Sequence, residues 1–162
     1  MLVRPNAVDA QWGPDGQHIV FTDATDGSIR TLDLKSGAEH LIVPFGVNPA
    51  WSRDGRRIAY SDNHNIFFVP VSPGGARVGA SVQLTFDDVF SVFSAQASWA
   101  ADGMSLVFSS NRGDLVDWDI WVVSVNGGEP ARLAGMVGTG DFDPAFYQKK
   151  LVAFPAFTPP GP

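Results

Sequence analysis

The chain has 162 residues, of which 44% are hydrophobic and 17% are charged, a composition that excludes a disordered protein and fits one globular domain. Its 11 basic and 17 acidic residues give a net charge of −6, so the clustered positive charge on which nucleic-acid binding depends is missing. The chain has no cysteine, which excludes a disulfide framework and a zinc–thiolate site.

Three segments of the chain repeat one template. In each, a tryptophan is followed three residues later by Asp-Gly, and then by an apolar triplet that ends in an aromatic residue. The tryptophans are Trp12, Trp51 and Trp99, which lie roughly 40–50 residues apart, a spacing typical of repeat architectures. Because Asp-Gly favours a tight turn, each segment is predicted to form a β-hairpin.

Further strands are predicted after each hairpin. The third strand of each repeat is expected at residues 29–34, 65–71 and 119–125. The fourth is expected at residues 39–43, 82–86 and 131–134. A fourth copy, residues 144–146 and 151–154, retains only the first hairpin and has lost Asp-Gly.

Four short antiparallel strands per repeat are typical of a propeller blade. We therefore predict an all-β fold, a partial β-propeller of three four-stranded blades plus the first hairpin of a fourth. The repeats are expected at about residues 5–46, 47–94, 95–140 and 141–154, before a proline-rich tail at residues 155–162. A β-sandwich built from similar hairpins is the main alternative, although it does not require the recurring tryptophan.

The repeat resembles a known family in several runs. These runs are Pro49-Ala50-Trp51-Ser52-x-Asp54-Gly55, Ser109-Ser110-Asn111-Arg112-Gly113, Asp119-Ile120-Trp121-Val122 and Gly127-Gly128-Glu129-Pro130-Ala131-Arg132-Leu133. They are similar to the TolB-type, WD40-like propeller repeat, which also occurs in the propeller halves of tricorn-like and prolyl-oligopeptidase-like peptidases. The resemblance covers nearly the whole chain and implies blade architecture, while implying little about function. The chain lacks the N-terminal α/β domain of TolB.

Closed propellers have roughly 4 to 8 blades, so this chain alone is not expected to close a ring. Either it is a piece of a larger propeller, or several chains complete a ring as a homo-oligomer; two copies of about three and a half blades would make seven. The long linker between Leu84 and Trp99 contains Phe90, Val92 and Phe93. These apolar residues either fold over their own blade or pack against a partner chain.

Acidic residues gather on one predicted face, where the loops between second and third strands meet the linkers between blades. Ten of the 17 acidic residues map there, against one base, Arg112. They are Asp23, Asp26, Asp62, Asp87, Asp88, Asp114, Asp117, Asp119, Asp141 and Asp143. One interpretation is that aspartate simply favours turns. The other is that this face, with Trp118 as an aromatic platform, attracts a basic partner.

A calcium ion is the one cofactor that the sequence suggests, at Asp114, Asp117 and Asp119, although the spacing is not that of a calcium hand. Catalytic residues are not recognisable, because no Gly-x-Ser-x-Gly elbow occurs. The histidines His18, His40 and His64 occupy different positions in their repeats, which argues against a shared metal site. No other cofactor is expected.

The sequence therefore favours a non-enzymatic scaffold that binds a protein or peptide on its loop face or in its channel. One alternative is a substrate-recognition or gating accessory of a hydrolase or lyase whose catalytic domain lies on another chain; another is a fragment without independent function. We expect a soluble chain without membrane insertion, because no apolar stretch approaches roughly 20 residues. We expect no signal peptide in this chain either, because residues 1–5 lack the n-region and h-region of one. The resemblance to TolB would make it periplasmic, and otherwise it would be cytoplasmic.

Overall fold

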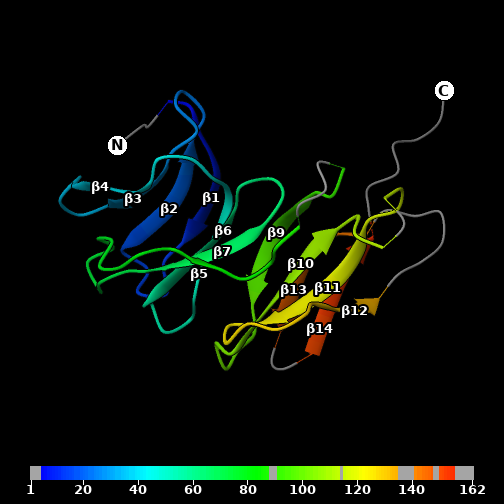
Figure 1. Ribbon diagram of the computed structural model, residues 1–162. Helices are drawn as coiled ribbons and strands as arrows, with labels where there is room; N and C mark the ends of the chain where they lie inside the picture. Colours follow the sequence, from blue (N-terminus) through cyan, green and yellow to red (C-terminus); the bar gives the residue numbers. More distant parts are fainter. Residues whose placement is uncertain (1–4, 88–90, 114, 135–140, 148–149, 156–162) are drawn as a thin grey trace.

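The computed structural model describes residues 5–87, 91–113, 115–134, 141–147 and 150–155, and the regular elements in that part of the chain are all strands. Three four-stranded antiparallel sheets follow one another along the chain (Figure 1). Within each sheet the strands lie side by side in sequence order, and a two-stranded hairpin comes last. The predicted all-β architecture of three blades and one further hairpin is confirmed.

The strand bounds are close to those predicted. Blade 1 consists of β1 (Ala7–Trp12), β2 (His18–Asp23), β3 (Ile29–Asp33) and β4 (Glu39–Val43). Blade 2 consists of β5 (Val47–Trp51), β6 (Arg57–Ser61), β7 (Ile66–Pro70) and β8 (Val82–Gln83). Blade 3 consists of β9 (Ser94–Trp99), β10 (Ser105–Ser110), β11 (Asp119–Ser124) and β12 (Ala131–Ala134). The last hairpin consists of β13 (Asp141–Tyr147) and β14 (Lys150–Pro155).

The Asp-Gly pairs form the first turn of each blade, as the sequence predicts. Their glycines, Gly16, Gly55 and Gly103, have φ angles of 66°, 72° and 67°, which a residue with a side chain adopts at a cost. The carboxylate of each preceding aspartate accepts a hydrogen bond from the backbone two residues further on, as Asp102 does from Met104 N at 2.9 Å. The repeated motif therefore serves to close the hairpins.

The fourth strand of blade 2 is shorter than predicted. Residues 82–86 were expected to pair with the third strand, but only Val82 and Gln83 pair in regular register, and Leu84 adds one backbone hydrogen bond from its N–H to Ile66 O at 2.8 Å. Beyond them, Ile66 N donates to the side-chain hydroxyl of Thr85 at 2.9 Å, and this replaces a backbone acceptor. The ladder ends there because a side chain has taken the place of a carbonyl.

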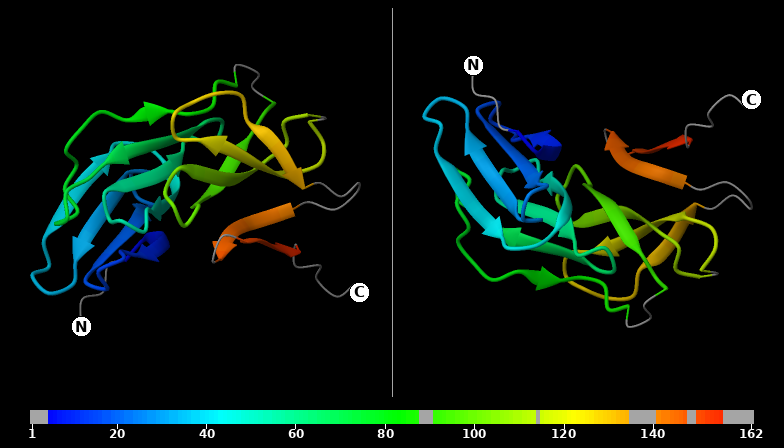
Figure 2. Two further views of the ribbon diagram at one scale, coloured as in Figure 1. Left: turned by 90° about the horizontal axis from the view of Figure 1, so that it is seen from below. Right: turned by 90° about the horizontal axis from the view of Figure 1, so that it is seen from above.

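The blades form an open arc in which the first strand of each blade is innermost (Figure 2). Strands β1, β5, β9 and β13 follow one another, each against the next. Each inner strand of blades 1–3 has a residue with positive φ three positions before its tryptophan: Asp9 (52°), Asn48 (49°) and Gln96 (55°). The pairing register shifts at the same place in each blade, so the β-bulge is part of the repeat.

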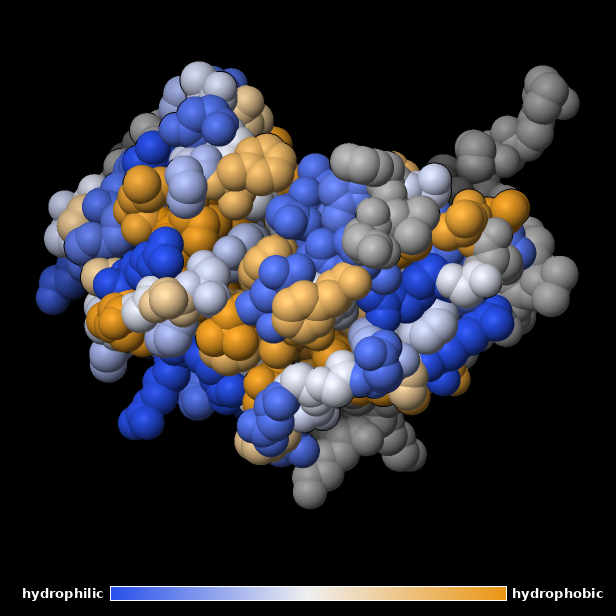
Figure 3. Space-filling view, viewed as in Figure 1, coloured by the Kyte–Doolittle hydropathy of each residue, from blue (hydrophilic) through white to orange (hydrophobic). Residues whose placement is uncertain are grey.

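Two hydrophobic clusters lie between adjacent blades. One joins blades 1 and 2 through Ile29, Ile58 and Val69, and the other joins blades 2 and 3 through Leu84, Leu106 and Phe108. Such consecutive apolar strands were predicted to be covered on both faces, and the covering surface is the neighbouring blade. On the face seen in Figure 3, the remaining apolar surface is divided into separate patches by polar residues. No helix long and apolar enough to cross a membrane occurs in the described ranges.

Candidate functional site

Loops and linkers meet at one end of the arc, which we call the loop end. It contains the β2–β3, β6–β7 and β10–β11 connections together with the linker that follows β8. Ser94 N donates to Asn63 O at 2.9 Å, and a ring nitrogen of His64 lies 2.8 Å from Val92 O. These contacts hold the linker against the β6–β7 loop, as the predicted connectivity requires.

Asn111, which follows β10, ties the linker to the β10–β11 loop. Its side-chain oxygen accepts a hydrogen bond from Phe93 N at 2.7 Å, and its amide group donates to Ser91 O at 2.8 Å. Leu115 N donates to Asn111 O at 3.0 Å. Because Asn111 is buried, these bonds are shielded from water and fix the two loops relative to each other.

Besides Phe86, which lines a separate cleft, the two loops expose three apolar residues: Phe93 (41%), Leu115 (48%) and Val116 (79%). We call them the loop-end patch. Phe93 stacks on His64 with ring centroids 5.1 Å apart, so its position is set by the β6–β7 loop. Leu115 has a φ angle of 66°, in the left-handed region that bulky residues rarely adopt. Packing on His64 therefore fixes Phe93, at one side of the patch. At the other side, the β10–β11 loop keeps the backbone of Leu115 in a strained conformation.

The described aspartates of the predicted acidic face are bonded within the chain. Asp62 accepts hydrogen bonds from the backbone of His64 and Asn65 at 2.9 and 2.7 Å. Both carboxylate oxygens of Asp119 contact Arg132, at 2.9 and 2.8 Å. These contacts agree with the interpretation that the aspartates shape turns and strand ends.

Arg30 supplies a further positive charge at the loop end. It lies 3.0 Å from Asp26 and 3.8 Å from Asp23. Hydrogen bonds from Ser28, together with Arg30, lower the pKa of Asp26 to about 2. The count of one base on this face was therefore wrong, because Arg30 and Arg132 reach it from strands β3 and β12.

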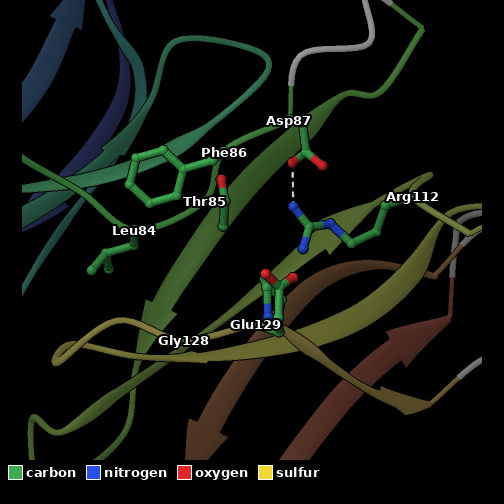
Figure 4. Close-up of a pocket in the computed structure, with 8 residues that line it drawn as sticks. Leu84, Thr85, Phe86, Asp87, Arg112, Gly128 and Glu129 are labelled. Carbon is green, nitrogen blue, oxygen red and sulfur yellow. Dashed lines mark hydrogen bonds and ion pairs between the residues drawn. The ribbon is translucent and has the colours of Figure 1, made fainter.

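Arg112 does not project from the loop end as predicted. Its side chain is only 12% exposed and runs back over the rings of Phe108 and Trp121, each with a centroid 5.4 Å from the guanidinium carbon. It forms an ion pair with Asp87 of the linker, as the dashed line in Figure 4 shows. Two residues assigned to a partner-binding face are thus brought together, but they bind each other across blades 2 and 3.

A small cleft opens beside this ion pair. Glu129 lines it from the β11–β12 turn, and its carboxylate points toward the guanidinium of Arg112 (Figure 4). Leu84, Thr85 and exposed Phe86 line it from blade 2. The cleft encloses about 70 Å³. Small-molecule sites usually enclose about 300–1,000 Å³, so this cleft has room for the end of one side chain and not for a metabolite.

The other predicted site residues divide into three groups. Val92 is 5% exposed and packs inside the chain, so it offers no surface to a partner. Asp117 and Trp118 are half-buried in the β10–β11 loop, where each makes contacts within the chain. The remaining positions fall outside the described residues, either entirely (Asp88, Phe90 and Asp114) or in their side chains (Asp141 and Asp143).

In the described ranges, no three His, Asp or Glu side chains gather as metal ligands. His18 is paired with Asp15 at 2.6 Å in a hairpin turn, whereas His64 is stacked under Phe93. The calcium hypothesis at Asp114, Asp117 and Asp119 remains a prediction. Any ion there would compete with Arg132 for the Asp119 carboxylate.

Sequence reasoning missed Asn111, Leu115 and Val116. Asn111 stands in a run that carries the family resemblance, but its role depends on a linker about 20 positions earlier in the chain, and the run does not reveal that contact. A signal did exist for the other two. Leu115-Val116 interrupts a loop that is otherwise rich in Asp, and two apolar residues in such a loop have no predicted core to enter.

Neither a family model nor a curated protein matches the chain. Solved structures do match, all at low sequence identity. The Cps50 (Swd1) β-propeller domain of Myceliophteria thermophila matches with a TM-score of 0.66, 13% identity, and coverage of 90% of this chain and 46% of that one. A prolyl endopeptidase matches with a TM-score of 0.62 and 14% identity, covering 89% and 24%. The tricorn protease matches with a TM-score of 0.58 and 14% identity, covering 85% and 14%.

The chain thus spans less than half the length of each of these three proteins. Its three unclosed blades have the architecture of a propeller domain, and two of the similar proteins are the kinds of peptidase that the repeat resembles. The resemblance to TolB-like, WD40-like β-propellers is therefore confirmed at the level of the fold.

Proposed function

We propose that this chain is part of a non-enzymatic β-propeller scaffold, and that it binds a protein or peptide through the loop-end patch of Phe93, Leu115 and Val116. Exposed apolar residues that lie together and are rimmed by polar groups are typical of interaction sites. Polar neighbours are present here, because His64 stacks on Phe93 and Asp117 follows Val116 in the β10–β11 loop. The proposal concerns an interface and requires no catalytic group.

Leu115 is the observation that carries the proposal. An apolar side chain exposed to water and a bulky residue in the left-handed region are both unfavourable, and Leu115 combines them. Glycine would relieve the backbone, and a polar residue would suit the solvent. Backbone strain of this kind clusters at functional sites, where the surrounding structure maintains it.

The partner we propose differs in part from the one expected from charge alone. Asp23, Asp26, Asp62, Asp87 and Asp119 are occupied by donors of the chain itself. Apolar contact with the loop-end patch therefore supplies the affinity, while the net charge of −6 favours basic partners in the approach and disfavours nucleic acid.

The scaffold that we propose is a homo-oligomer. In the described part of the chain, blade 1 has a neighbouring blade on one side only, and so does the last hairpin. Uncovered ends of a repeat array expose apolar surface that is normally capped or shared with another chain.

The test is a selection of peptides from a random displayed library on the intact chain, followed by calorimetry with the selected peptides. We expect the variant Leu115→Ser to weaken their binding at least tenfold. Leu41→Ser is the matched control, because Leu41 is equally exposed but lies in β4 of blade 1. Peptides that bind both variants as tightly as the parent chain would refute a site at the loop-end patch.

A second candidate function is that of an accessory that recognises or gates substrate for a hydrolase on another chain. The structural similarity to two peptidases, each much longer than this chain, favours it. It predicts that the chain lowers the KM of a separate catalytic chain for peptides, and that Leu115→Ser abolishes this effect. A scaffold without that role would bind the same peptides and leave the KM unchanged.

A further inference from the structure

Trp12, Trp51 and Trp99 occupy the same position in three repeats but differ in exposure. Trp99 is 7% exposed and Trp12 is 66% exposed, with Trp51 between them. The local fold is the same in all three, since each tryptophan ends an inner strand that carries the same bulge. The difference must therefore come from what lies against each ring.

The blade that precedes each tryptophan in the chain covers it. Trp99 of blade 3 packs into the cluster shared with blade 2, and its indole N–H donates to Ala50 O at 2.9 Å. Trp51 of blade 2 packs against the cluster shared with blade 1, and its ring centroid lies 6.1 Å from that of His18. Its N–H has no acceptor among the described residues, so burial of the ring, and not the hydrogen bond, is the common feature.

The face of blade 1 that carries Trp12 has no such cover. Along β1, every residue after Ala7 is exposed, including Val8. The corresponding strands β5 and β9 bury the residue two positions before the tryptophan, Pro49 and Ala97, whereas β1 exposes it. Blade 1 therefore presents the surface that blades 2 and 3 bury, with its aromatic residue in water.

We propose that a second copy of this chain covers the Trp12 face with its β13–β14 hairpin, an inference that rests on the proposed homo-oligomer. The inner strands form a series in which β5 lies against β1, β9 against β5, and β13 against β9. In the described part of the chain, β13 has an inner strand against it on the side of β9 only, and β1 has one on the side of β5 only. The contact between β13 of one copy and β1 of the next continues an interface that the chain already forms within itself.

This contact joins two different surfaces, head to tail. The backbone acceptor corresponding to Ala50 O is Ala145 O of the second copy, because Ala145 precedes Phe146 as Ala50 precedes Trp51. A head-to-tail contact generates a closed ring when its rotation closes. In a ring of two copies the two hairpins lie at separate junctions, so each occupies its own blade position. The ring then has about eight positions and not seven, within the range of known propellers.

The first test measures molar mass by light scattering over a range of concentrations. We expect the parent chain to form a discrete closed oligomer, and both Trp12→Arg and Val8→Lys to be monomers with unchanged circular dichroism, since both side chains are exposed in a single copy. Val116→Arg, at the loop end, should keep the mass of the parent. A parent chain that is monomeric at every concentration, or a Trp12→Arg variant with the parent's mass, would overturn the proposal.

The second test uses the absence of cysteine from the chain. A mixture of Ala10→Cys and Ala145→Cys chains is treated with a bifunctional maleimide; Ala10 is exposed and occupies the position of Ala97, on the same face of its strand as the tryptophan. A head-to-tail contact gives cross-linked pairs that contain one of each variant. Cross-linking of the Ala10→Cys chain to itself would show a symmetric contact instead and would overturn this arrangement. Peptide binding by Trp12→Arg separates the two proposals, because the loop-end patch lies on other blades and should bind in a monomer.

Discussion

The three equivalent tryptophans allow a prediction with an internal control. An indole side chain buries about 200 Å², and at about 25 cal/mol per Å² its removal from the core costs about 5 kcal/mol. Because Trp99 is almost fully buried and Ala retains a little of that burial, we expect Trp99→Ala to lower the free energy of unfolding by about 4 kcal/mol. Its hydrogen bond to Ala50 O and its contact with Arg57 are included in this loss. About a third of Trp12 is covered, so Trp12→Ala should cost about 1 kcal/mol.

The assay is unfolding in urea followed by circular dichroism, with linear extrapolation to water. Both variants are measured at a concentration where their molar masses are equal, so that assembly does not contribute to the difference. Trp51→Ala should fall between the two, because Trp51 is partly buried. A difference of less than about 1 kcal/mol between Trp99→Ala and Trp12→Ala would refute the reasoning that the preceding blade decides the burial of each ring.

Three further predictions concern the loop end. The lowered pKa of Asp26 means that its contribution to stability is present above the unfolded-state value of 3.8 and is lost as the pH falls toward about 2. In the Asp26→Asn variant, the urea midpoint of unfolding should therefore depend less on pH between about 2 and 3.8. A variant whose midpoint changes with pH as it does in the parent chain would contradict the cause given for the lowered pKa. Asn111→Ala removes buried hydrogen bonds to the linker and should cost about 2 kcal/mol in urea unfolding, with faster hydrogen exchange at Phe93 N. Arg112→Met and Asp87→Asn should each destabilise, while the double variant loses less than their sum by about 1 kcal/mol; strict additivity would show that the ion pair contributes nothing.

Parts of the candidate site were predictable because they depend on local chemistry. The loops were placed correctly by counting strands, since alternate connections of an antiparallel sheet emerge at the same end. That aspartate favours turns was one of the two interpretations that the sequence offered for the acidic residues, and it too rests on local chemistry. Their partners were not predictable, because Arg30 and Arg132 reach them from strands whose register the sequence does not specify.

The sequence by itself determined the blade. Asp-Gly sets the hairpin turn through the positive φ of its glycine, and the apolar triplets set the strands, so the repeat can be recognised within a dozen residues. The exposure of residues at equivalent positions was decided only by tertiary structure. Trp12 and Trp99 have the same local sequence pattern and the same backbone, yet one is in water and the other in the core, because burial depends on whether a neighbouring blade is present. Tertiary contacts likewise decide that Val92 is inside and Leu115 outside, a distinction that hydrophobicity alone does not make.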